Sequence, residues 1–285
     1  MSIKNIPIRN INVPKDLAFT ENFSIRDLSV LLSGKDMVQD IHRHDFFFML
    51  VLKKGRGEHT IDFIPYKIQD HSVFFMRPGQ VHKLKIKAGS TGFVIQFKKD
   101  FYSTADKDSR QLLRRVSNNN LYKHDAKKFL KIFSLVTDIF QEYEHKREKY
   151  FDVIKADLEI LFIELLRENK NDTDHTATIN RDRLEEFSEL LDVNVSTNKQ
   201  PSYYAQKLNL TPYQLNTITK TSLGKTSSEF INEHIILEAK RYLLSTSNQV
   251  KEIAYHLGYD DVSYFIRFFK KHTGLSPEAF RSNFS

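Results

Sequence analysis

The chain has 285 residues, of which 40% are hydrophobic and 28% charged, and its length and composition suit a globular protein with two separate cores. It contains no cysteine, which excludes disulfides, zinc–thiolate sites and cysteine nucleophiles. The formal net charge of +7 suits a polyanionic partner, while the lack of a signal peptide and of any run near about 18 apolar residues predicts a cytoplasmic protein without a membrane span.

Short segments rich in β-branched and aromatic residues occupy the chain up to about residue 100, with glycine and proline between them. A spacing of about ten residues with turn residues in between indicates a small antiparallel sandwich or barrel, which we place at about 20–100. The expected strands are Phe46–Leu52, Glu58–Phe63, Ser72–Met76, His82–Ile86 and Gly92–Phe97.

Three histidines within this region form a recognisable pattern. His42 and His44 share one face of a strand, and His82 follows the turn Pro78-Gly79. The pattern resembles the two sequence motifs of a cupin barrel, and in metal-binding cupins these histidines ligate together with a glutamate. Phe48 stands at the glutamate position here. Three imidazoles could still hold Zn²⁺ or Fe²⁺, but a large apolar side chain in place of the carboxylate argues against it, so we expect no metal and no cofactor.

The same residues are candidates for a small-ligand pocket. Phe46 to Met49 form an aromatic run, and Arg77 beside the turn could meet an anionic group. The alternative is that these histidines and aromatic residues only serve the core of the fold. The candidate pocket residues are His42, His44, Phe48, Arg77 and His82.

Residues 93–200 contain neither glycine nor proline, and their pattern becomes helical. Apolar residues that recur at intervals of three and four predict amphipathic helices at about 125–148 and 152–169. Their apolar faces would cover the barrel or pair with a second subunit. The polar stretch that follows indicates a linker. The expected division is a sensing and dimerisation domain at 1–170, a linker at 171–178 and a helical domain at 179–285.

The helical domain contains a tandem repeat. Ala205–Leu210 aligns with Ala254–Tyr259 at an offset of 49, and Leu215–Lys220 aligns with Phe265–Lys270 at an offset of 50. The second copy therefore has one extra turn residue, and the repeat indicates a duplicated supersecondary unit. The two units are expected at about 201–224 and 250–274.

Each copy has the features of a helix-turn-helix. Asn209 or Gly258 can adopt positive φ at the turn, where a β-branched residue would be strained. Thr211 or Asp260 is expected to cap the second helix. The intervening segment Ser228–Leu244, capped by Ser227 or Ser228, is expected to be a helix of about 25 Å. Such a helix could hold two recognition helices in successive major grooves, about 34 Å apart.

The second helix of each copy has an apolar face and a polar face. Leu215, Ile218 and Leu223 are expected to point inward in the first copy, and Phe265, Phe268 and Phe269 in the second. Outward amide, hydroxyl, aromatic and basic groups can contact base edges and phosphates. The two tyrosines could instead shield a helix interface, and Lys271 could be a solvated charge. The candidate DNA-binding residues are Tyr213, Gln214, Asn216, Thr217 and Lys220 in the first copy, and Ser263, Tyr264, Arg267, Lys270 and Lys271 in the second.

Charge adds little to this argument. From Thr178 to Ser285 there are 13 Lys and Arg against 12 Asp and Glu, a net of +1. From Lys199 onward the count is 11 against 7, a net of +4. The inference of DNA binding therefore rests on the repeat and its motif.

Residues 179–282 resemble the DNA-binding domain of the AraC/XylS family. The most specific segment is 250–281, where the family pattern Ile-Ala…Gly-Tyr…Phe…Phe-Lys…Gly…Pro…Phe-Arg is complete. The first unit departs from the pattern, since Thr217 and Thr219 stand where the family commonly has Arg and Phe. The resemblance implies transcription regulation, usually activation, through promoter DNA and RNA polymerase, and a cupin-like module often precedes this domain.

The sequence thus predicts an α+β protein of two domains, an N-terminal cupin-like β-barrel with helices and a C-terminal all-α tandem helix-turn-helix. We expect a sequence-specific DNA-binding transcription regulator and not an enzyme, acting as an activator and a homodimer, with a small-molecule effector as a further partner. Two alternatives are a metal-dependent cupin enzyme fused to a DNA-binding tail and an architectural DNA binder without an effector.

Overall fold

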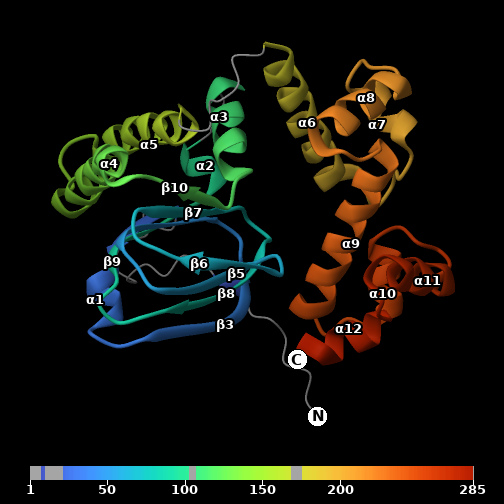
Figure 1. Cartoon of the computed structure of the whole chain (residues 1–285), viewed down its shortest axis with the longest axis horizontal. Coiled ribbons are helices and arrows are strands. Elements are labelled where there is room, and N and C mark those ends of the chain that lie inside the picture. Colours follow the sequence, from blue (N-terminus) through green and yellow to red (C-terminus); the bar gives the residue numbers. More distant parts are fainter. Residues whose placement is uncertain (1–7, 10–21, 103–106, 168–174, 285) are drawn as a thin grey trace. The chain divides into compact units, whose positions relative to one another are not determined.

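A computed structural model describes residues 8–9, 22–102, 107–167 and 175–284 (Figure 1). The chain divides into two compact units, one within Pro7–Asn171 and the other within Asp172–Ser285. Among the helices of these described ranges, none is long and apolar enough to cross a membrane.

The first unit is built on two five-stranded sheets. Its strands are β1 (Ile8–Arg9), β2 (Phe23–Asp27), β3 (Met37–His44), β4 (Phe47–Lys54), β5 (Gly57–Ile61), β6 (Ile64–Ile68), β7 (Ser72–Met76), β8 (Val81–Ile86), β9 (Thr91–Phe97) and β10 (Leu121–Lys123). One sheet has the order β1-β3-β8-β5-β6 and the other β10-β7-β4-β9-β2. The pairing is antiparallel except between β1 and β3. The five predicted strands are therefore found as β4, β5, β7, β8 and β9, and β1, β2, β3, β6 and β10 complete the two sheets.

Five helices in the described part of this unit connect or cover the sheets (Figure 1). They are α1 (Leu28–Leu32), α2 (Lys99–Tyr102), α3 (Lys107–Ser117), α4 (Ala126–His145) and α5 (Tyr150–Arg167). The predicted pair of long helices corresponds to α4 and α5. The Asp125 side chain caps α4 by accepting a hydrogen bond from the Lys128 backbone N–H at 2.9 Å, and α4 ends where Lys146 adopts a φ of +48°.

Strand β4 is buried on both faces. Phe47, Met49 and Val51 belong to a core that also contains buried residues of α4 and α5. Phe48 and Leu50 belong to a second core, to which both sheets contribute. This double burial explains why the aromatic run at the start of β4 lacks the alternation of polar and apolar residues that a half-exposed strand would show.

The second unit is helical in its described residues. Its helices are α6 (His175–Asn194), α7 (Pro201–Lys207), α8 (Pro212–Leu223), α9 (Ser227–Ser245), α10 (Val250–His256), α11 (Val262–Thr273) and α12 (Pro277–Phe284). The predicted fold class, a sheet-rich N-terminal domain and a helical C-terminal domain, is confirmed. Of the segment that the sequence assigns to a linker, 175–178 form the first residues of α6, and 171–174 lie outside the described residues.

Two helix caps differ from the prediction. The N-cap of α11 is Asp261, not Asp260, because the extra turn residue of the second copy precedes the cap. The N-cap of α9 is Thr226, not Ser227 or Ser228. The Thr226 hydroxyl accepts from the Glu229 N–H at 3.2 Å, and the Glu229 carboxylate accepts from the Thr226 N–H at 2.7 Å. This reciprocal pair is a capping box, which satisfies two backbone donors at once.

Two inward-facing predictions also need correction. Leu223 is 37% exposed because it is the last residue of α8, where the helix ends in the left-handed turn at Gly224. Phe268 is only partly buried, and its ring lies against those of Tyr259 and His272. The core of α11 is formed instead by Phe265 and Phe269, both fully buried.

Candidate nucleic-acid interface and histidine cluster

The two helix-turn-helix units share the same hydrogen bond across their turns. The Leu210 N–H donates to the Ala205 carbonyl at 2.8 Å in the first unit. The Tyr259 N–H donates to the Ala254 carbonyl at 2.9 Å in the second. Both alanines are fully buried between their helices. The repeat in the sequence is therefore a repeat in backbone structure.

Both turns use positive φ, as the sequence predicts. Asn209 has a φ of +55° and Gly258 a φ of +71°. The second turn is also crowded, since a Cβ added at Gly258 would lie 1.6 Å from the Ser196 carbonyl oxygen. The Lys199 ammonium donates to the Gly258 carbonyl at 2.8 Å and lies over the Tyr259 ring. The segment between α6 and α7 is thus packed against the second turn.

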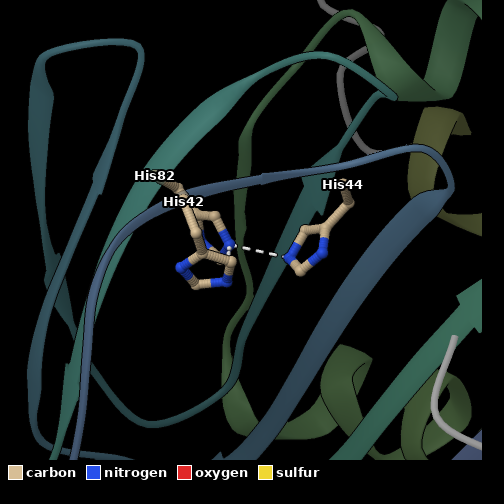
Figure 2. Close-up of side chains that lie close together, drawn as sticks. All are labelled: His42, His44 and His82. Atoms are coloured by element: carbon tan, nitrogen blue, oxygen red, sulfur yellow. Dashed lines mark hydrogen bonds between the residues drawn. The ribbon is translucent and has the colours of Figure 1, made fainter. Parts of the chain in front are cut away.

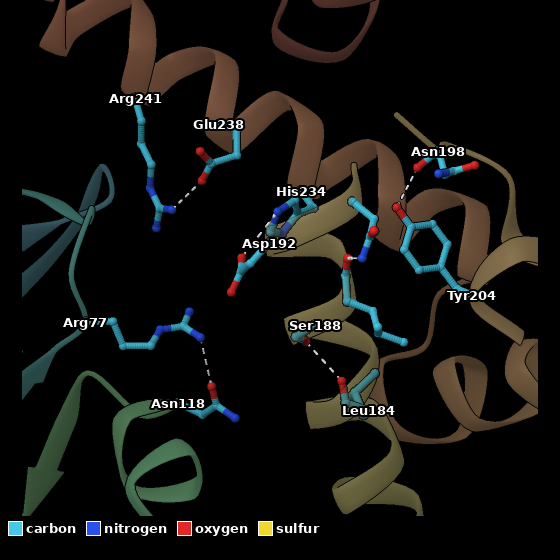
Figure 3. Close-up of polar contacts among 12 residues, drawn as sticks. Arg77, Asn118, Leu184, Ser188, Asp192, Asn198, Tyr204, His234, Glu238 and Arg241 are labelled. Carbon is cyan, nitrogen blue, oxygen red and sulfur yellow. Dashed lines mark hydrogen bonds and ion pairs between the residues drawn. The ribbon is translucent and has the colours of Figure 1, made fainter. Parts of the chain in front are cut away.

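Helix α9 connects the two helix-turn-helix units and contacts both. It has 19 residues, which corresponds to about 28 Å, and it packs on α7 and α8 as well as on α10, α11 and α12 (Figure 1). On its α6 side, the His234 Nε2 lies 3.4 Å from the Asp192 Oδ1 (Figure 3). The two recognition helices are therefore held on one continuous support.

Helix α11 presents its candidate residues to solvent. Ser263, Tyr264, Arg267, Lys270 and Lys271 are all exposed. The Arg267 guanidinium lies 3.9 Å from the carboxylate of the cap Asp261, but both side chains are more than half exposed, so this ion pair contributes little. The helix thus offers a hydroxyl, a phenol, a guanidinium and two ammonium groups to a partner.

Helix α8 uses part of its polar face within the protein. The Asn216 Oδ1 accepts from the Ser227 N–H at 3.1 Å, and the Thr217 hydroxyl donates to the Tyr213 carbonyl at 2.9 Å. The Gln214 side chain completes the cap of its own helix by accepting from the Thr211 N–H at 2.8 Å. Two further candidates on this helix, Tyr213 and Lys220, are exposed.

In the sheet-rich unit within Pro7–Asn171, four buried histidines meet on the inner face of one sheet. The His82 Nε2 lies 2.9 Å from the His42 Nε2 and 2.8 Å from the His44 Nε2 (Figure 2). The His82 Nδ1 lies 2.8 Å from the Nε2 of His59, and the His42 Nδ1 lies 2.7 Å from the Asp40 carbonyl. A ligand nitrogen from each of His42, His44 and His82 can be chosen so that all three lie within 4.8 Å of one another.

Aromatic rings surround this cluster. The Phe48 ring stacks on His44 with centroids 5.5 Å apart, and it also lies against His82 and His59. Burial lowers the pKa of His59 to about 3, with a smaller contribution from His42, so the His59 ring is neutral at physiological pH.

The structure brings together four of the five residues proposed for a ligand pocket. His42, His44, Phe48 and His82 are neighbours, while the Arg77 guanidinium donates to the Asn118 side chain at 3.1 Å (Figure 3). His59 is not part of the cupin-like sequence motif, so the motif did not predict it. It alternates with exposed or half-exposed residues of β5, and this strand periodicity could have placed it on the inner face.

Two family matches cover most of the described chain. Residues 33–147 match the family described as AraC-like ligand binding domain, and residues 204–283 match a helix-turn-helix domain family. The chain belongs to the AraC family of transcription regulators. In this AraC-family regulator the tandem helix-turn-helix is the DNA-binding domain, and the sheet-rich unit is the ligand-binding domain. The match is to regulators, which are generally not enzymes.

Curated relatives align with the regulator over most of its length. It is 24% identical to the HTH-type transcriptional activator RhaS of Salmonella paratyphi A over 243 residues, which are 84% of this chain and 86% of RhaS. It is 23% identical to the transcriptional activator RhaR of Mannheimia succiniciproducens over 252 residues, which are 86% of this chain and 87% of RhaR. Among solved structures, ToxT of Vibrio cholerae with bound unsaturated fatty acid is 18% identical, with a TM-score of 0.44 over 91% of this chain and 95% of ToxT.

Proposed function

We propose that this regulator activates transcription in the cytoplasm by inserting α8 and α11 into adjacent major grooves of promoter DNA. It acts as a homodimer, contacts RNA polymerase, and responds to a small molecule through its sheet-rich N-terminal unit. The proposal rests on the exposed basic and polar face of α11. This helix belongs to the second helix-turn-helix unit, which α9 joins to the first unit of the same chain. The relatives RhaS and RhaR, both called transcriptional activators, support the direction of regulation.

The chemistry of α11 suits sequence-specific contact. A guanidinium such as that of Arg267 can donate two parallel hydrogen bonds to the O6 and N7 of guanine in the major groove. Lys270 and Lys271 lie at the C-terminal end of the helix, where ammonium groups can contact phosphates without base preference. The exposed hydroxyl of Ser263, near the N-terminus of α11, can approach a base edge or a phosphate.

The length of α9 suits two adjacent grooves. Its span of about 28 Å approaches the separation of about 34 Å between successive major-groove segments on one face of B-DNA. The side chains at the two ends of such a support can make up the remaining distance. We therefore infer one composite site in which each helix-turn-helix contacts one groove segment.

The first experiment selects duplexes from a random pool with the full-length protein and maps the contacts on the winner by footprinting. We expect two contacted groove segments centred about ten base pairs apart on the same face of the duplex. A protein that binds no duplex more tightly than competitor DNA would refute the proposal. A single contacted groove segment would restrict the proposed DNA contact to α11.

The direction of regulation needs a separate measurement. A reporter placed downstream of the selected duplex should rise when the regulator is expressed, and sedimentation should show a dimer at micromolar concentration. A reporter that falls instead would make the regulator a repressor. A reporter that rises equally under every growth condition would favour a DNA binder without an effector.

A further inference from the structure

The segment between α6 and α7 contacts both helix-turn-helix units. On one side it is tied to the first helix-turn-helix, because the Tyr204 hydroxyl of α7 donates to the Asn198 carbonyl (Figure 3). The Asn198 N–H in turn donates to the Asn194 carbonyl, at the end of α6, at 2.8 Å. On the other side, Lys199 reaches the turn of the second helix-turn-helix. The segment is therefore a connection between the two helix-turn-helix units in addition to α9.

Lys199 makes this connection through its ammonium group. The Nζ donates to the Gly258 carbonyl at 2.8 Å and to the Ser196 carbonyl at 3.4 Å, and it lies 4.6 Å from the centroid of the Tyr259 ring. A hydrogen bond from a charged donor is stronger than one between neutral groups, and an aromatic face attracts a cation. One side chain thus joins parts of the chain that are 59 positions apart.

The ammonium group is partly removed from water. Lys199 is half-buried, and burial lowers the pKa of its ammonium, while the nearby Asp260 carboxylate acts in the opposite direction. A lysine in such a place gives up hydration and side-chain freedom that a surface lysine keeps. The contacts with the two carbonyls and the ring offset this loss, so the placement indicates a structural role at this point of the domain.

The contact with Tyr259 extends to the second recognition helix. The Tyr259 ring is buried, and it lies 5.9, 5.3 and 5.7 Å, between centroids, from the rings of Tyr264, Phe265 and Phe268 in α11. Because close-packed interiors transmit displacements, a shift of the Tyr259 ring would move α11 with it. Lys199 therefore supports α11 through one aromatic ring.

We propose that Lys199 is a positioning residue that fixes the orientation of α11 relative to α8, so that the regulator distinguishes duplexes by the spacing of their two groove segments. The inference rests on the proposed function, in which α8 and α11 contact adjacent segments. A single connecting helix can bend along its length, and a second connection limits that motion. Helices that are already oriented bind a correctly spaced duplex without a further ordering cost.

The geometry of DNA makes spacing a sensitive variable. B-DNA has about 10–10.5 base pairs per turn of roughly 34–36 Å, so one inserted base pair moves a groove segment by about 3.4 Å and rotates it by about 35°. Two rigidly held recognition helices cannot follow both changes, whereas two helices joined only by α9 can follow part of them. The loss of affinity on insertion therefore measures how firmly the two helices are connected.

The first test compares the selected duplex with the same duplex carrying one base pair inserted between the groove segments. We expect the insertion to weaken binding by about 10-fold or more in the wild type and by about 3-fold or less in K199M. K199R should restore the wild-type ratio, because a guanidinium can donate to carbonyls and stack on an aromatic ring. A wild-type ratio in K199M would overturn the proposal.

K207M is the matched control. The Lys207 ammonium lies over the Tyr203 ring, and both residues belong to α7, so this lysine makes its aromatic contact within the first helix-turn-helix. K207M removes the same charge as K199M and should weaken binding to both duplexes alike, with the wild-type ratio between them. A ratio in K207M as low as that in K199M would assign the effect to charge and overturn the proposal.

A distance measurement without DNA separates this inference from the proposed function. The chain has no cysteine, so S222C on α8 and K271C on α11, both at exposed positions, can carry the only two spin labels. In the full-length protein with these labels we expect a narrow distribution of label distances, which K199M should broaden and K207M should leave narrow. Distributions of equal width with and without K199M would overturn the role of Lys199.

Y204F is a second variant for the case that K199M does not fold. It keeps the buried ring and removes only the hydroxyl that donates to the Asn198 carbonyl. It should broaden the distance distribution in the same way, and an unchanged distribution in Y204F would then overturn the proposal. A wild-type protein that binds both duplexes equally would instead refute the proposed contact with two grooves.

Discussion

The turn of the first helix-turn-helix is made by Asn209, and the turn of the second by Gly258. Both residues adopt positive φ, and the same backbone hydrogen bond spans each turn. The difference lies in what surrounds them, since a Cβ at Gly258 would meet the Ser196 carbonyl at 1.6 Å. The duplicated unit has therefore kept its backbone, while its second copy has become closely packed against a neighbouring segment.

The recognition helices differ in a second way. On α8, the side chains of Gln214, Asn216 and Thr217 make hydrogen bonds within the protein. On α11, Arg267 and Lys270 are exposed. A polar group that already has an intramolecular partner gains less from binding DNA, because that partner must be given up. We therefore expect α11 to contribute more base discrimination than α8.

The largest effect is expected at the crowded turn. G258A should lower the free energy of unfolding by about 3 to 4 kcal/mol, because alanine is disfavoured at this φ and its Cβ would collide with backbone. N209G places the residue that best tolerates positive φ in the first turn and should change stability by less than about 1 kcal/mol. Urea denaturation of the full-length protein measures both, and a loss in G258A no larger than that in N209G would contradict the steric crowding at Gly258.

Loss of Arg267 is expected to have the next largest effect, on DNA binding. R267A should weaken binding to the selected duplex by about 1–3 kcal/mol and relax discrimination at one base position. T217A, at the matching position of the first unit, should cost less than about 0.5 kcal/mol, because this hydroxyl is bonded to its own helix. Dissociation constants for the duplex and its single-base variants decide the matter. A uniform loss across sequences would assign Arg267 to phosphate contact.

The helix caps should behave alike in the two units. D261A and T211A each remove a side chain that accepts from backbone N–H groups in the first turn of a recognition helix, and each should cost about 1 kcal/mol of stability. D260A is the matched control for the second unit, since Asp260 is adjacent and exposed but is not the cap. A larger loss in D260A than in D261A would contradict the capping geometry.

The smallest effects are expected from the exposed lysines. K271A and K220A should each reduce the slope of log affinity against log salt by about 1 if the ammonium contacts a phosphate. The two changes compare one basic residue from each recognition helix. An unchanged slope in K271A would identify that lysine as a solvated charge, and an unchanged slope in K220A alone would confine phosphate contact to the second unit.

The sequence by itself determined the architecture and the family. Hydrophobic periodicity located α4 and α5, and glycine and proline spacing located β4, β5, β7, β8 and β9, because these signals depend on neighbours along the chain. The repeat identified both turns, because only a few residue types tolerate the φ of Asn209 and Gly258. The caps were displaced by one or two residues, since propensity alone does not tell which of two adjacent polar residues reaches the backbone.

Only the tertiary structure decided which polar groups remain exposed and which are used internally. The sequence predicts Asn216 as a DNA-binding residue, and only the structure shows that its Oδ1 accepts a hydrogen bond from the Ser227 N–H of α9. His59 lies in the histidine cluster because β5 pairs with β8, and the paired residues of these strands, Gly57↔Ile86 to Ile61↔His82, are 29 to 21 positions apart in the sequence. Such contacts depend on long-range packing, and local sequence patterns carry no information about the distance between two side chains on different strands or helices.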